Sequence, residues 1–85
     1  MADFNFTQHA TAEPSGANVH IDPEANYGYW EYRDGTEGGG LWFAPTPGGR
    51  VELIDYDGAF ELPSGTVAAI RSMGYEVDGS FEPWP

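Results

Sequence analysis

The chain contains no cysteine, no lysine and no long apolar run, and each absence removes a class of protein. Without cysteine it cannot form a disulfide, a thiolate zinc site or a cysteine nucleophile. No apolar run approaches the roughly 18–20 residues that a membrane-spanning helix needs. The first residues, MADFNF, lack the basic start and apolar stretch of a signal peptide. We therefore expect a protein of the cytoplasm.

Positive charge is scarce in this sequence. Three arginines stand against 14 acidic residues, which gives a formal net charge of −11 at pH 7. Such a chain repels nucleic acids and anionic membranes, because phosphate binding requires Lys and Arg side chains. It is attracted to basic surfaces, and this attraction accelerates association. Two simpler interpretations stay open: the acidity only keeps a small domain in solution, or it reflects adaptation to salt.

Aromatic residues, in contrast, are abundant. They make up 15% of the 85 residues, and hydrophobic residues make up 40%, so the chain has material for a core despite its charge. Its length fits one domain, residues 1–85. We expect a less regular segment over 1–26, a body of strands and one helix over 27–78, and a tail over 79–85.

Strand patterns dominate the body. Alternating or aromatic-rich stretches predict strands, and the Asp57-Gly58 pair predicts a two-residue hairpin turn, since both residue types tolerate positive φ. The glycine run over 38–40 is interpreted as part of a loop. The strands expected in this way cover residues 4–8, 19–21, 27–33, 41–43, 50–56, 59–62 and 75–78.

One helix is expected at about 64–73. Ser64 is suited to cap its start, and Gly74 is suited to end it in a left-handed conformation. Apolar residues at three-residue spacing give it one buried stripe. That stripe consists of Val67, Ile70 and Met73. The pattern as a whole predicts an α+β fold, a small antiparallel sheet of about 4–6 strands with this short helix packed on one face.

The predicted hairpin divides the side chains between two faces. It places Leu53 and Leu62 on the face that meets the helix, with Asp55 on the same side near the turn, and Trp30 and Tyr32 are assigned to the core. Aromatics mixed with carboxylates on the opposite, free face are typical of an interface. The alternative is that residues 1–26 fold across this face and bury it. The free face is predicted to contain Tyr29, Glu31, Trp42, Glu52, Tyr56 and Glu61.

No motif for catalysis or for a cofactor stands out. His9 and His20, with Asp22 or Glu24, make a loosely spaced ligand set, so surface histidines without a ligand role are the preferred interpretation. The DYDG stretch at 55–58 lacks the later ligands of a calcium loop, and a plain turn explains it better. The serines lack a nucleophile elbow, and the glycine run lacks the lysine of a phosphate loop. We expect no enzymatic activity, no metal and no cofactor.

As a short acidic chain built as one compact domain of strands with a helix, the protein resembles the small phage-encoded anti-CRISPR proteins. The resemblance covers the chain as a whole and rests on no shared motif. It implies a cytosolic inhibitor made in an infected bacterium. Acidic members of that family typically cover a basic nucleic-acid-binding surface of the interference complex. A protein partner of this kind is expected, without direct binding of nucleic acid or membranes.

Charge mimicry gives this expectation a physical form. Carboxylates along a rigid sheet stand in for phosphates, and aromatic side chains supply anchoring area. The rival hypothesis is a structural or adaptor module, or a homodimer, that docks through its aromatic sheet face. Salt separates the two, because it weakens charge mimicry and not apolar docking. The residues expected to bind the partner are Glu31, Asp34, Glu37, Glu52, Asp55, Asp57 and Glu61, with Tyr29, Trp42 and Tyr56.

Overall fold

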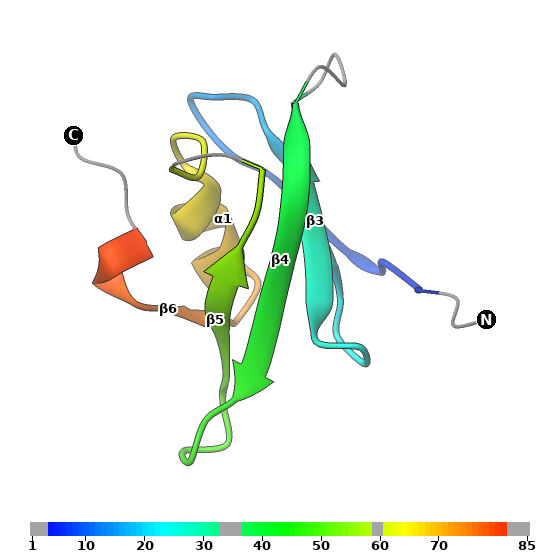
Figure 1. Ribbon diagram of the computed structural model, residues 1–85, viewed down its shortest axis with the longest axis vertical. Helices are drawn as coiled ribbons and strands as arrows, with labels where there is room; N and C mark the ends of the chain where they lie inside the picture. The colour runs from blue at the N-terminus through cyan, green and yellow to red at the C-terminus, as the bar shows by residue number, and fades with distance from the viewer. Residues whose placement is uncertain (1–3, 33–36, 59–60, 82–85) are drawn as a thin grey trace.

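The computed structural model describes residues 4–32, 37–58 and 61–81. Within these residues the chain forms six strands, one α-helix and a short 3₁₀ turn (Figure 1). The strands are β1 (Gln8–Thr11), β2 (Asn18–Asp22), β3 (Tyr27–Glu31), β4 (Gly38–Pro45), β5 (Val51–Tyr56) and β6 (Glu76–Val77). The helix α1 spans Thr66–Ser72, and the 3₁₀ turn η1 spans Gly79–Phe81.

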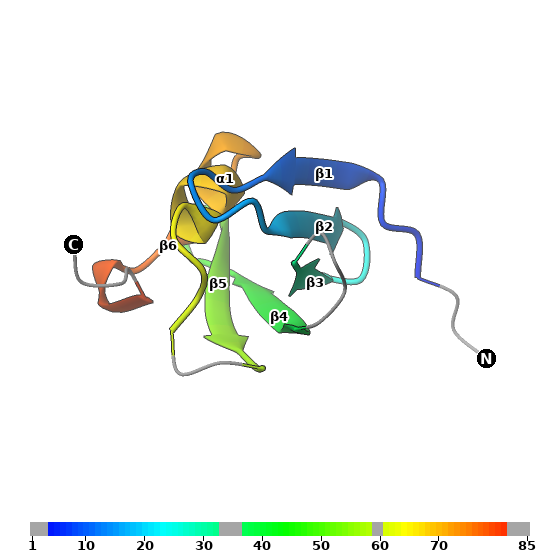
Figure 2. The ribbon, with the colours of Figure 1, turned by 90° about the horizontal axis from the view of Figure 1, so that it is seen from above.

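The six strands form one sheet in their order along the chain. Neighbouring strands are antiparallel except β5 and β6, which are parallel. A parallel pair requires a crossover connection, and α1 supplies it. Seen from above, the strands curve round a common interior, and α1 packs beside both edge strands, β1 and β6 (Figure 2). A mostly antiparallel sheet with one short helix confirms the predicted α+β fold.

The core lies between the inner side of the sheet and α1. The two-residue alternation of strands turns Val19 and Ile21 of β2 and Trp30 of β3 inward. Leu53 of β5 and Ile70 of α1 complete the centre of the same cluster. All five side chains are at most 1% exposed, so the assignment of Trp30 to the core is confirmed. Burying side chains of this size stabilises the fold by about 1.5–3 kcal/mol each.

The two ends of α1 are set by glycines. Gly65 occupies the N-cap with φ of 90°, and no side chain caps the helix, so the predicted role of Ser64 is wrong. A Cβ on Gly65 would lie 2.0 Å from the carbonyl oxygen of Glu13, which shows how closely the β1–β2 loop packs on the helix start. Gly74, with φ of 99°, follows the helix as predicted.

The predicted hairpin after β5 is wrong. β5 ends at Tyr56, and Glu61 and Leu62 belong to no strand. Residues 59–60, which the prediction also included, lie outside the described residues. The crossover through α1 returns the chain as β6, which occupies the side of β5 that a hairpin strand would have taken.

The glycine run over 38–40 is the start of β4 and not a loop. Its residues pair with the end of β3, where Gly39 lies opposite Trp30. A Cβ on Gly39 would lie 1.6 Å from the carbonyl oxygen of Asp57, so the backbone after β5 approaches too closely for any side chain. The same carbonyl accepts a hydrogen bond from Trp30 Nε1 at 3.2 Å.

Candidate interaction face

The outer side of the sheet, away from α1 and the core, carries two rows of large side chains. Directly opposed residues of neighbouring strands point to the same side. Tyr27 of β3 lies opposite Trp42 of β4, and Trp42 lies opposite Asp55 of β5. A second row runs from His9 of β1 through His20 of β2 to Tyr29 of β3. We call this side the outer face; its polar margin includes Glu31 and Glu52, which pair with Gly38 and Ala44.

Aromatic rings form a continuous band across the outer face. Tyr27 and Trp42 meet with ring centroids 5.6 Å apart, and His20 stacks on Tyr29 at 4.6 Å and 21°. Phe4 packs on Tyr27 at 5.0 Å, and Phe6 meets Tyr29 edge-on at 4.9 Å. Phe4 is 50% exposed and Trp42 39% exposed. The aromatic band comprises Phe4, Phe6, His9, His20, Tyr27, Tyr29 and Trp42.

The segment before β1 is fastened to this face by Asp22. Asp22 Oδ2 accepts a 2.7 Å hydrogen bond from the N–H of Asn5, and Oδ1 accepts bonds from the N–H groups of Glu24 and Ala25 at 2.9 and 3.1 Å. The Asn5 bond is the main cause that lowers the pKa of Asp22, and burial of the carboxyl opposes it. The predicted strand over 4–8 is therefore wrong except at Gln8, where β1 begins, because residues 4–7 lie across the sheet before that strand.

The alternative that residues 1–26 fold across the free face and bury it is correct only in part for the residues described. β1 and β2 extend the sheet sideways from β3. Phe4 and Phe6 cover only the part around Tyr27 and Tyr29. Trp42 and Asp55 remain exposed.

The two histidines contact each other on this face. His9 Nδ1 and His20 Nδ1 are 2.7 Å apart, so one nitrogen donates and the other accepts. His20 Nε2 lies 3.5 Å from Glu31 Oε1. Burial raises the pKa of the Tyr29 hydroxyl, and the Glu31 carboxylate adds to that shift. Among the residues that the structure describes, no group of three or more His, Cys, Asp or Glu side chains is placed to hold a metal ion.

A β-bulge in β5 changes the predicted faces. Leu53 pairs with Phe43 and Asp55 pairs with Trp42, which leaves Ile54 as the extra residue. Asp55 therefore lies on the outer face, although the regular alternation predicted it on the core side. Tyr56 is shifted the other way: it packs against the core, and its ring lies 5.7 Å from that of Phe81.

The structure brings together about half of the predicted binding residues. Tyr29, Glu31, Trp42, Glu52 and Asp55 share the outer face. Glu37 is exposed just before β4, and Asp57 and Glu61 are exposed after β5. Asp34 lies outside the described residues. The contribution of Phe4, Phe6 and Tyr27 to this face was not predicted from the sequence, although Tyr27 alternates with Tyr29.

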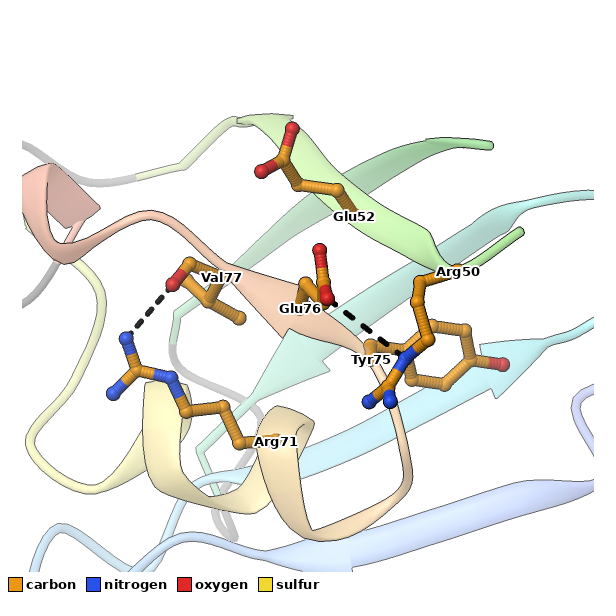
Figure 3. A pocket seen from close by; sticks show the side chains of 6 residues that line it. All are labelled: Arg50, Glu52, Arg71, Tyr75, Glu76 and Val77. Carbon is orange, nitrogen blue, oxygen red and sulfur yellow. Dashed lines mark hydrogen bonds and ion pairs between the residues drawn. The ribbon is translucent and has the colours of Figure 1, made fainter. Parts of the chain in front are cut away.

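A hollow of about 420 Å³, which shares Glu52 with the margin of the outer face, lies where the start of β5, the end of α1 and β6 meet (Figure 3). Arg50 Nε lies 3.8 Å from Glu76 Oε1, and Arg71 Nη2 donates a 2.7 Å hydrogen bond to the carbonyl of Val77. Both guanidinium groups therefore interact with other residues that line the hollow, and Glu52 adds a second carboxylate to the lining. The lining of the hollow therefore carries both signs of charge.

Comparisons with known proteins add no relative. No family model matches the chain, and neither a curated protein nor a solved structure matches it. Within residues 4–32, 37–58 and 61–81, no helix is long and apolar enough to cross a membrane.

Proposed function

We propose that this domain acts by binding a protein with a cationic surface, through its outer face and without catalysis. The observation that carries the proposal is the aromatic band, which ends at the exposed Trp42 directly beside the carboxylate of Asp55. Exposed aromatic clusters of this kind mark contact surfaces, and Trp and Tyr are frequent interface anchors.

Charge favours a basic partner over other ligands. With 14 acidic residues and three arginines, the chain has too few arginines to give most carboxylates a cationic partner of their own. Docking against an acidic or neutral surface would leave such carboxylates desolvated and unpaired, which is costly. A second copy of the chain is disfavoured for the same reason, because a twofold contact would set this acidic face against itself. Lys and Arg side chains on the partner make cation–π contacts with the rings and ion pairs with the carboxylates.

The narrower proposal is that the partner surface normally binds nucleic acid, as in a CRISPR interference complex. Its support is the net charge of −11 together with carboxylates held on a rigid sheet. A purely apolar adaptor module is the rival, and the size of the aromatic band is the observation that favours it. The two proposals differ in how much the carboxylates of Glu31 and Asp55 contribute to partner binding: charge mimicry depends on them, and apolar docking does not.

Affinity capture with matched variants tests the proposal. The full chain is used as bait in a lysate of a bacterium that carries a CRISPR system, and the bound proteins are washed at low and then high salt. One double variant, Glu31→Gln with Asp55→Asn, removes two carboxylates from the outer face. The control, Glu13→Gln with Glu61→Gln, removes the same charge from exposed positions outside the sheet.

We expect the wild type and the control to retain a nucleic-acid-binding protein at low salt, and the outer-face variant to lose it. Added DNA should compete for the same protein. Retention at high salt by all three baits, without competition from DNA, would overturn charge mimicry and favour the apolar module. Equal loss in both double variants would show that only net charge matters, and would overturn the outer face as the site.

A further inference from the structure

Trp42 forms an open aromatic shelf at the middle of the outer face. Gly40 lies two residues earlier in β4, so it occupies the same face of the strand as Trp42, and it has no side chain there. A Cβ on Gly40 would lie 2.8 Å from the indole carbon Cη2 of Trp42, so the indole lies directly over Gly40. One side of the ring therefore covers the strand, while Trp42 as a residue stays 39% exposed. The exposed part of the ring is available to a partner.

A carboxylate that has no cationic partner among the described residues borders this shelf. Asp55 lies directly opposite Trp42 in the β4–β5 register and is exposed. Its Oδ1 accepts a 2.9 Å hydrogen bond from the N–H of Tyr56. The ion pairs in the described part of the chain join His20 to Glu31 and Arg50 to Glu76, so neither neutralises Asp55. Its second oxygen remains available for a ligand.

On the far side of Trp42, Tyr27 closes the row. It lies opposite Trp42 in the β3–β4 register, and the two rings meet at 64° with centroids 5.6 Å apart. Phe4 packs on Tyr27 in turn, at 5.0 Å. The shelf is thus bounded by an aromatic wall on one side and a carboxylate on the other.

From this geometry we infer that the outer face recognises an arginine side chain of the partner, stacked on Trp42 and paired with Asp55. The inference rests on the proposed function and specifies the chemistry of its partner. A guanidinium group is planar and weakly hydrated, so it stacks on an indole while its N–H groups reach a carboxylate in its own plane. A lysine ammonium has no planar face to stack on the indole and loses more hydration on binding, so only its charge would contribute to binding at this site.

Two short peptides test this inference directly. Both are capped and of equal length and charge, one with three arginines and one with three lysines separated by glycines. The readout is the indole N–H signal of Trp42 in a heteronuclear NMR spectrum, which a Trp42→Phe variant identifies. We expect the arginine peptide to shift that signal and to bind about three- to tenfold more tightly than the lysine peptide.

Asp55→Asn is the matched variant, because its side-chain oxygen can still accept the bond from the Tyr56 N–H. We expect it to weaken the arginine peptide about three- to tenfold, while Glu61→Gln leaves the affinity within about twofold. Equal binding of both peptides at Trp42 would overturn arginine recognition and leave a cationic outer-face site intact. Binding that shifts only residues around Arg50 and Glu76, or no binding by either peptide, would overturn the site on the outer face itself.

Discussion

At the scale of single residues, Asp22 does more than close a turn. Its carboxylate accepts hydrogen bonds from Asn5 and from the β2–β3 turn, and so it holds Phe4 and Phe6 against the sheet. The sequence placed Asp22 only among weak metal-ligand candidates. Nothing in its immediate neighbours indicates a bond to a residue 17 positions earlier, because that contact depends on how the chain returns across the sheet.

Asp22 also gives the N-terminal segment a predicted response to acid. Because folding lowers its pKa, the stabilisation is fully present above the ordinary value of 3.8 and is lost as the pH falls through the lowered pKa. We expect the amide signal of Asn5 to move toward its unfolded position over that acidic range.

An Asp22→Asn variant should show a displaced Asn5 signal already at neutral pH and should lose the acid response. Asp78, whose pKa is lowered by its hydrogen bonds from Ser80, supplies an internal reference at the Ser80 amide. An Asn5 signal that is unchanged by the substitution would contradict the anchoring role of Asp22.

At the scale of elements, the β5 bulge decides which side chains reach the outer face. Period-2 alternation predicted β2, β3 and the inward position of Trp30 correctly, since these strands are regular. It failed in β5, because one unpaired residue, Ile54, reverses the alternation for everything that follows. The local sequence around Ile54 carries no glycine or other signal that marks a bulge.

Leu53 and Ile54 give a direct test of which side of β5 faces the core. They are adjacent and similar in size, yet Leu53 is 1% exposed and Ile54 is 52% exposed. We expect Leu53→Ala to lower the free energy of unfolding by about 2–4 kcal/mol and Ile54→Ala by less than about 1 kcal/mol. Urea unfolding measures both. Equal losses would contradict the assignment of Ile54 to the outside.

The start of β4 is a second element that the sequence did not reveal. Consecutive glycines normally indicate a loop, but here they admit the backbone of Asp57 and the indole of Trp42. We expect Gly39→Ala to destabilise the protein by about 1–3 kcal/mol, because the added methyl has no room. Gly48→Ala is the control: its Cβ would meet only Thr46 Oγ1 at 3.9 Å. A Gly39→Ala variant as stable as that control would contradict the close approach.

At the scale of the whole molecule, the net charge of −11 acts on stability as well as on partners. Like charges on one small domain repel each other, and salt screens that repulsion. We expect the Tm to rise when NaCl increases from about 0.01 to about 0.5 M. The double variant Glu13→Gln with Glu61→Gln should show a smaller rise. A Tm that falls with added salt would contradict net self-repulsion.

Composition and pattern predicted the fold class and the acidic, aromatic character of one sheet face. They did not predict how the N-terminal segment crosses that face, or that β6 replaces a hairpin strand, because both depend on contacts between residues distant in sequence. Phe4 and Phe6, read as strand residues, became part of the candidate face only through their packing on Tyr27 and Tyr29.

The most direct test of the central claim is side-chain footprinting of the captured complex by oxidation of aromatic residues. If the outer face is the contact surface, Trp42 and Phe4 should be protected in the complex, while Tyr75, beside the hollow of Arg50 and Arg71, should keep the reactivity that it has in the free chain. Unchanged reactivity of Trp42 and Phe4, with protection around that hollow or α1, would contradict the account.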